Sequence, residues 1–318
     1  MTYIQANTDG RLHPASEPSI SPLNRGFLYG DAIYEVWRTY QGTIFAFEEH
    51  WQRLENSAKS LHLDLPLDRQ RLIEEIRRTA QAFREKTGHA PDLYIRLQIS
   101  RGSGAIGLDI SLADKPSYVL LVQALKPLPE KWRCDGMRVS VARTLRRMHA
   151  DTVNPAWKTG NYLNNILCLR EAQSQGADEV LIPNLAGEIS EASVSNFFFV
   201  RGATVVTPPL SAGILAGVTR KLVIEQVAPR AGIEVREETV RVEDLKVFQE
   251  CFISSTTKEL APVSAIDEVP FAVGENTVTE KLRKTFNELV RDYIAAHPEL
   301  NILSNSRVRS KGSASTVP

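Results

Sequence analysis

Short runs that alternate polar and apolar residues occupy the first 125 positions, together with two longer stretches of helical spacing. Alternation on either side of Asp9-Gly10 predicts a β-hairpin over residues 3–13. Further strands are expected over residues 42–47, 93–100 and 118–125. Apolar residues three and four apart predict helices over residues 48–61 and 67–86. These elements favour a compact first domain, residues 1–125, that mixes α and β structure.

A second domain is expected after KPLPEK, residues 126–131, because two prolines and little apolar content are typical of a linker. Its predicted strands cover residues 138–143, 179–183, 197–207 with a turn at Gly202, and 251–254. Its predicted helices cover residues 162–175, 218–228 and 278–296. The fold class is therefore a two-domain α+β or α/β protein, with the second domain over 132–302. Residues 303–318 are rich in serine, basic residues and glycine and are predicted to be a flexible tail.

Composition limits the kinds of partner. Lysine plus arginine and aspartate plus glutamate number 38 each, so the formal net charge is zero and no overall charge attracts nucleic acid or membrane. A small-molecule substrate fits better. The three cysteines are widely scattered, and the amino terminus lacks a basic start followed by an apolar core. With no run near the roughly 18 apolar residues of a membrane span, we expect a cytoplasmic protein.

The candidate chemistry begins with Lys158, in the segment NPAWKTGNYLNN over residues 154–165. About thirty residues later, the segment EISEASVSNFFFV over 188–200 supplies Glu191 and Asn196. An aldehyde cofactor needs an amine that forms a Schiff base and a carboxylate that keeps its pyridine nitrogen protonated. Lys158 and Glu191 are candidates for these two roles.

Six segments in order carry a resemblance to a known family. They are LNRGFLYGDAIYE at 23–35, EEHWQRL at 48–54, the lysine segment, the glutamate segment, GILAGVTR at 213–220 and SSTTKELAPV at 254–263. The chain thereby resembles the class IV aminotransferases, which are pyridoxal-phosphate enzymes of fold type IV. The resemblance implies a small N-terminal α/β domain and a larger C-terminal pseudo-barrel domain that binds pyridoxal 5'-phosphate. It also implies a homodimer with a shared active site, completed by a partner loop near residues 27–29 and 102–108.

The resemblance assigns roles to particular residues of this chain. It implies that the cofactor phosphate is held by Arg53, Val218, Thr219, Thr256 and Thr257. A helix amino terminus at residue 218 fits that role, because its free amide groups and dipole favour an anion. Tyr162 matches the tyrosine that bonds the cofactor's phenolic oxygen, and Asn196 is expected to support Glu191. The expected substrate-binding residues are Tyr34, Val36, Arg38, Tyr94 and Arg96, with the two arginines as candidates for a carboxylate.

Other motifs do not carry a function. Residues 102–107 satisfy GxGxxG, but no helix pattern or βαβ unit follows, so a flexible loop over the active site is expected in place of a dinucleotide site. The sequence SxxK at 255–258 follows KTG at 158–160, which is the reverse of the order in serine acylases. The histidines show no paired ligand spacing, so no metal site is expected.

The implied reaction is a ping-pong transamination between an amino acid or amine and a 2-oxo acid, in which Lys158 is both tether and acid–base. A branched-chain amino acid is the first candidate donor, because Tyr94-Ile95-Arg96 is similar to the branched-chain aminotransferases. Tyr34-Glu35-Val36 is instead similar to the D-amino-acid transaminases, so a D-amino acid or an (R)-amine stays open. The loop at 101–108 and the run NYLNNIL at 161–167 also occur in aminodeoxychorismate lyases. A lyase, or a cofactor-binding protein without turnover, is therefore the alternative.

Overall fold

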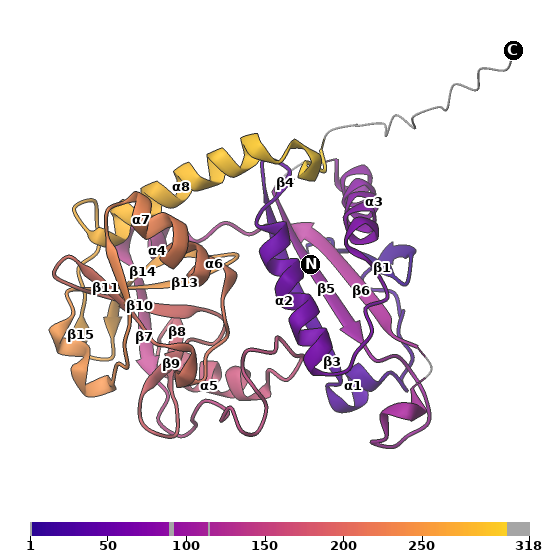
Figure 1. Ribbon diagram of the computed structural model, residues 1–318, viewed down its shortest axis with the longest axis horizontal. Helices are drawn as coiled ribbons and strands as arrows, with labels where there is room; N and C mark the ends of the chain where they lie inside the picture. Colours follow the sequence, from indigo (N-terminus) through magenta and orange to yellow (C-terminus); the bar gives the residue numbers. More distant parts are fainter. Residues whose placement is uncertain (1, 89–91, 114, 304–318) are drawn as a thin grey trace, which may run out of the picture.

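The computed structural model describes residues 2–88, 92–113 and 115–303, and its strands form two sheets (Figure 1). Every strand pair in the first sheet is antiparallel, and the strand order is β2-β1-β6-β5-β3-β4. Its strands are β1 Gln5–Thr8, β2 Arg11–Pro14, β3 Ala32–Tyr40, β4 Thr43–Ile44, β5 Leu93–Ser100 and β6 Ser117–Ala124. The predicted hairpin is confirmed as β1 and β2, and the predicted tail lies outside the described residues except for Leu303.

Two amphipathic helices cover one face of this sheet, and their bounds follow the predicted spacing. The helices of this half are α1 Arg25–Tyr29, α2 Phe47–Ser60 and α3 Arg69–Thr87. The carboxylate of Asp68 caps α3 by accepting a hydrogen bond from the Arg71 amide. The apolar stripes of α2 and α3 pack on the sheet around the fully buried Trp37.

Strand β5 shows how the sheet divides its two faces. Leu93, Ile95, Leu97 and Ile99 are buried in the core beneath the helices. Successive side chains of a strand point to opposite faces, so the alternate residues, Arg96 among them, lie on the other face. That face is turned away from α2 and α3 and is free to form a wall of a cavity.

Six strands of the second sheet close into a barrel. The pairings run β10–β13–β14–β7–β8–β9 and return to β10, with β14–β7 and β7–β8 parallel. This closure confirms the predicted pseudo-barrel. The strands of the whole second sheet, inside and outside the barrel, are β7 Met137–Val141, β8 Glu179–Pro183, β9 Ile189–Glu191, β10 Asn196–Arg201, β11 Thr204–Thr207, β12 Glu234–Glu237, β13 Glu250–Ser255, β14 Glu259–Ile266 and β15 Val269–Pro270.

The helices of the second half lie around the barrel, and α8 joins the two halves. They are α4 Glu130–Asp135, α5 Leu163–Ser174, α6 Val218–Leu222, α7 Ala228–Arg230 and α8 Val278–Ala296, with a π-helical segment, Val223–Val227, between α6 and α7. Short 3₁₀ turns cover Ile110–Leu112, Leu210–Ala212, Val242–Val247 and Pro298–Leu300. Helix α8 runs above both halves (Figure 1), and its Tyr293 hydroxyl accepts a hydrogen bond from the Phe47 amide at 3.1 Å. In the described part of the chain, no helix is both long and apolar enough to cross a membrane.

The structure departs from the predicted elements in several places. The expected strand over 42–47 shortens to Thr43–Ile44, because α2 already begins at Phe47. Strand β3 was not predicted, since both of its faces are largely buried and its apolar residues alternate weakly. Helix α4 begins at Glu130, inside the predicted linker, so the domain boundaries stay a prediction.

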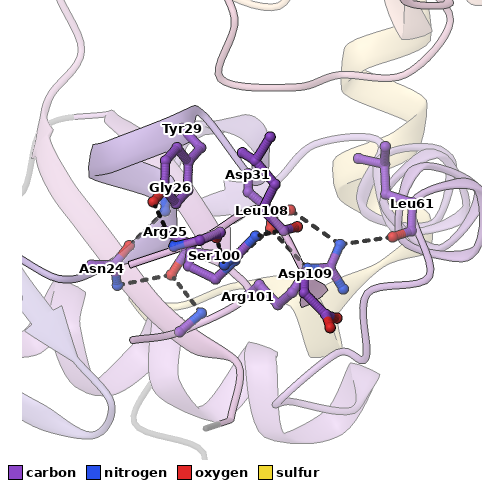
Figure 2. A network of polar contacts seen from close by, with 12 residues as sticks. Asn24, Arg25, Gly26, Tyr29, Asp31, Leu61, Ser100, Arg101, Leu108 and Asp109 are labelled. Atoms are coloured by element: carbon purple, nitrogen blue, oxygen red, sulfur yellow. Dashed lines mark hydrogen bonds and ion pairs between the residues drawn. The ribbon is translucent and has the colours of Figure 1, made fainter. Parts of the chain in front are cut away.

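A network of charged side chains holds the loop that follows β5 (Figure 2). The carboxylate of Asp31 accepts hydrogen bonds from Arg25, at 3.1 Å, and from Arg101, at 2.8 Å. The buried Arg25 guanidinium also donates to the carbonyl oxygens of Gly107 and Leu108. Burial alone would raise the pKa of the Asp31 carboxyl, but the two arginines hold it below its usual range. The loop is thus anchored to α1, a helix of the same half of the chain.

Candidate active site

A cavity of about 180 Å³ lies between the two sheets, at the free face of β3 and β5. Most of the residues predicted for the site line it: Tyr34, Val36, Arg53, Tyr94, Arg96, Lys158, Asn196, Val218, Thr219, Thr256 and Thr257. They come from both halves of the chain. Among the described residues that line this cavity, none belongs to the loop at 101–108, which was expected to lie over the site.

Lys158 is held in place by its backbone. The Tyr34 amide donates to the Lys158 carbonyl at 2.9 Å, and the Lys158 amide donates to the Ser57 hydroxyl at 3.2 Å. The side-chain Nζ lies 3.4 Å from the Tyr162 hydroxyl and 4.4 Å from the centre of the Tyr34 ring. The segment between β7 and α5 therefore presents an amine to the cavity, between two tyrosines.

Glu191 ends strand β9 behind the cavity wall. One carboxylate oxygen pairs with Arg147 at 2.7 Å, and the other accepts from the Leu215 amide at 2.9 Å and from Asn196 at 3.3 Å. Burial raises the pKa of the Glu191 carboxyl, and the Arg147 charge opposes that effect. Asn196 also donates to the Leu215 carbonyl. The structure thus brings the predicted pair Glu191 and Asn196 together, and both contact Leu215, which lines the cavity.

One end of the cavity is rich in hydrogen-bond donors. All five residues predicted to hold a phosphate line the cavity. Gly217 precedes α6, and a Cβ at that position would lie 2.1 Å from the Asn196 Oδ1 atom. The hydroxyl of Ser254 is buried at the cavity wall and has no hydrogen-bond partner within the described part of the chain. A buried donor of this kind suits a bound oxyanion.

Sequence reasoning missed three residues that act behind the wall, Glu35, His50 and Arg147. Glu35 lies on β3, and its carboxylate accepts two hydrogen bonds from Arg53, at 2.7 and 2.9 Å, and contacts His50 at 2.8 Å. Burial alone would raise the pKa of Glu35, but Arg53 and His50 hold it well below its usual range. An acidic residue between the core residues Ile33 and Trp37 was the available signal, because period two points it inward.

The predicted substrate residues divide into two groups. Tyr34, Val36, Tyr94 and Arg96 line the cavity. The Arg96 guanidinium stacks on the Tyr34 ring at 3.8 Å and donates to Gln98 at 2.9 Å. Arg38 does not line it; its guanidinium pairs with Glu259 of β14 at 2.6 Å and stacks on Tyr40. The structure therefore engages Arg38 in a contact between the two sheets.

Together, the fold and the site define a class of protein. A two-sheet enzyme with an amine, a buried carboxylate and a donor-rich end in one cavity has the groups needed to work on a substrate amino group with an anionic cofactor. Residues 32–266 match the family model for amino-transferase class IV. The chain belongs to this family.

Curated relatives cover most of the chain. A putative branched-chain-amino-acid aminotransferase of Methanocaldococcus jannaschii is 35% identical, over 88% of this chain and 94% of the relative. A D-alanine aminotransferase of Listeria monocytogenes is 31% identical, over 88% of this chain and 94% of the relative. An aminodeoxychorismate lyase of Bacillus subtilis is 28% identical, over 92% of this chain and 96% of the relative. Branched-chain aminotransferases, D-amino-acid transaminases and aminodeoxychorismate lyases, three of the activities considered from the sequence, are each represented.

Solved structures share the whole architecture. The branched-chain aminotransferase of Thermoproteus uzoniensis with norvaline superimposes with a TM-score of 0.82 at 30% identity, covering 92% of this chain and 98% of the other. The branched-chain amino acid aminotransferase of Escherichia coli gives a TM-score of 0.79 at 28% identity, covering 91% and 94%. Another branched-chain amino acid aminotransferase, solved with pyridoxamine 5'-phosphate, gives a TM-score of 0.81 at 28% identity, covering 92% and 97%. These similarities confirm the predicted fold class.

Proposed function

We propose that this aminotransferase uses pyridoxal 5'-phosphate to move the amino group of a branched-chain type amino acid to a 2-oxo acid by a ping-pong mechanism. The observation that carries the proposal is the Lys158 amine, which faces the cavity with the buried Glu191 carboxylate behind the wall. The similarity to branched-chain aminotransferases supports the donor class.

The residues present fit the cofactor. Arg53, Thr219, Thr256 and the α6 amino terminus would hold the phosphate, and the unpartnered Ser254 hydroxyl adds a donor at the same wall. Glu191 would keep a proton on the pyridine nitrogen. When bound, pyridoxal 5'-phosphate supplies an aldehyde that takes up the substrate amine and a ring that accepts electrons from the substrate α-carbon.

Lys158 would move the proton in this reaction. Once the substrate amine has displaced it, its Nζ atom is free to take the proton from the substrate α-carbon and would deliver it to the cofactor carbon that carried the aldehyde. The Tyr162 hydroxyl, 3.4 Å from Nζ, would hold the amine on its path. The cost of misplacing a catalytic group by even 1 Å explains why the lysine backbone is bonded to β3 and α2.

The wall formed by β3 and β5 supports an amino acid with an apolar side chain. Tyr34, Val36 and Tyr94 present mainly apolar surface, while Arg96 presents a positive charge held by Tyr34 and Gln98. A fixed guanidinium suits a carboxylate of the donor or of the 2-oxo acid.

Two other activities have specific support. Val36 lines the cavity together with Tyr34, and the segment Tyr34-Glu35-Val36 resembles the D-amino-acid transaminases, so a D-amino acid or (R)-amine is the second candidate donor. The run NYLNNIL at 161–167 supports an aminodeoxychorismate lyase. A lyase releases pyruvate and needs no 2-oxo acid.

A donor panel tests the proposal. Purified enzyme loaded with pyridoxal 5'-phosphate is supplied with 2-oxoglutarate or pyruvate and with L-leucine, D-alanine, an (R)-arylamine or aminodeoxychorismate, and the products are measured. We expect L-leucine to give its 2-oxo acid at the highest kcat/KM. A higher kcat/KM with D-alanine or the arylamine would assign the second candidate donor. Release of pyruvate from aminodeoxychorismate, with no oxo product from the other donors, would assign the lyase.

We also propose a homodimer. Phe27, Ile106 and Leu108 are 70%, 76% and 80% exposed, although they are large and apolar. Arg25 donates to the Gly107 and Leu108 carbonyls and so holds the loop that carries Ile106 and Leu108 to α1, the helix that carries Phe27. A second copy that covered this surface would remove the apolar area from water. The loop of the first copy would then help to complete the cavity of the second.

A further inference from the structure

We infer that Glu35 and His50 are positioning residues, which hold Arg53 and Thr256 in place for the phosphate of the cofactor. Neither residue lines the cavity, as far as the described residues show. Both are buried and belong to a chain of contacts, Arg53–Glu35–His50–Thr256, that runs from α2 to β3, back to α2 at His50, and on to the turn after β13. The inference rests on the proposed use of a phosphorylated cofactor.

Glu35 determines the orientation of the Arg53 guanidinium. The carboxylate takes the Nε hydrogen and one terminal hydrogen, at 2.7 and 2.9 Å, while the Ala216 carbonyl takes another at 3.1 Å. An arginine has five N–H donors in a rigid plane, so three fixed contacts leave its direction fully determined. The remaining donors can then face a phosphate without loss of side-chain freedom on binding.

His50 extends this support to the other half of the chain. Its Nδ1 atom lies 2.8 Å from the Glu35 carboxylate, and its Nε2 atom lies 3.5 Å from the Thr256 hydroxyl. The ring is 2% exposed and packs against Trp37. Because Arg53 belongs to the first sheet's helices and Thr256 to the second sheet, His50 sets the distance between two phosphate donors from different halves.

Charge neutralisation is the competing role for Glu35, and it has the opposite consequence. If the carboxylate only cancelled the Arg53 charge, its removal would strengthen the attraction between Arg53 and an anionic phosphate. If it positions Arg53, its removal weakens phosphate binding. The sign of the change in cofactor affinity therefore distinguishes the two roles.

The test compares pyridoxal 5'-phosphate with pyridoxal, which lacks the phosphate. Dissociation constants of both are measured on the apo forms of the full-length wild type, Glu35→Gln and His50→Asn. We expect Glu35→Gln to bind pyridoxal 5'-phosphate roughly tenfold to a hundredfold more weakly, as for loss of hydrogen bonds to a charged group, with pyridoxal affinity nearly unchanged. Unchanged or tighter binding of pyridoxal 5'-phosphate by Glu35→Gln would overturn the inference.

His50→Asn keeps a donor near the Nδ1 position but is too short to reach Thr256. We expect a loss of about threefold to tenfold in pyridoxal 5'-phosphate affinity alone. Because this variant keeps the Glu35–Arg53 ion pair, it also tests the positioning role if Glu35→Gln does not fold. In that case, a ratio of pyridoxal 5'-phosphate to pyridoxal affinity equal to that of the wild type would count against the inference.

A matched control is available in Glu75. This buried glutamate on α3 is also paired with arginines, Arg71 and Arg78, but it lies in the first core away from the cavity. Glu75→Gln should leave both affinities unchanged. Equal affinity of the wild type for the two ligands would contradict the proposed function, because the cavity would then not bind the phosphate. A wild type that prefers pyridoxal 5'-phosphate, with variants of the same preference, would reject only the positioning role of Glu35 and His50.

Discussion

Lys158 and Glu191 illustrate how single residues are prepared for the site by their neighbours. Lys158 is oriented by two backbone hydrogen bonds, and Glu191 is held by Arg147, Asn196 and the Leu215 amide. The sequence predicted Lys158, Glu191 and Asn196 from their motifs. It could not predict Arg147, because the ion pair with Glu191 joins segments whose approach depends on the barrel.

Replacing Lys158 by alanine removes the amine while leaving the walls of the cavity intact. We expect transamination to fall by at least about 10²-fold, since a positioned acid–base group contributes roughly 10²–10⁴-fold. Some cofactor should still bind through the phosphate end. Turnover measured with cofactor present checks the claim, and wild-type rates in the variant would refute it.

Gly217→Ala tests the closeness of α6 to Asn196. The added Cβ would lie 2.1 Å from Asn196 Oδ1, so the amino terminus of the helix or the asparagine must shift. We expect a roughly tenfold or greater loss of pyridoxal 5'-phosphate affinity, because the shift misaligns donors to the phosphate. Titration of the apo protein with pyridoxal 5'-phosphate measures this affinity. An unchanged affinity would show that the donors at the start of α6 tolerate the added methyl group.

At the scale of elements, the periodic segments were predicted best. Helix α8 and strand β5 have the predicted bounds because each has a clear apolar period, and β8 has them as a short apolar run. Strands β3 and β14 were missed, since burial on both faces removes the alternation. The π-helical segment between α6 and α7 leaves no signal in residue spacing.

The loop after β5 depends on Asp31, which joins α1 to the loop through Arg25 and Arg101. Its pKa is lowered in the folded protein, so its contribution to stability is present above its usual value of 3.8 and is lost as the pH falls through the folded value. We expect Asp31→Asn to lower the free energy of unfolding by about 1–3 kcal/mol at pH 7. Urea unfolding at several pH values should show the difference from wild type shrinking in acid; a difference independent of pH would contradict this account.

At the scale of the whole molecule, the cavity exists because two sheets meet. Its walls combine residues as distant in sequence as Tyr34 and Thr257, with α8 running above both halves (Figure 1). Motifs indicated most of the residues that line the cavity. They could not indicate that Arg38 would pair with Glu259 across the two sheets, because that contact depends on how the sheets pack.

The exposed apolar loop predicts the assembly. We expect the wild type to be a dimer and Leu108→Asp to shift it toward monomer with loss of activity, because a charge would be buried at the interface. Leu185→Asp is the control, since Leu185 is similarly exposed, at 69%, on the turn between β8 and β9. Light scattering after gel filtration measures the mass; a fully active wild-type monomer would exclude the proposed dimer.

The most direct test of the central claim is a single half-reaction. Enzyme loaded with pyridoxal 5'-phosphate is mixed with L-leucine in the absence of any 2-oxo acid, and the oxo acid released per site is measured together with the cofactor absorbance. The account predicts one equivalent of oxo acid per site, conversion of the cofactor to its amine form, and recovery when 2-oxoglutarate is added. Release that continues beyond one equivalent without a 2-oxo acid, or no release with any amine donor, would contradict it.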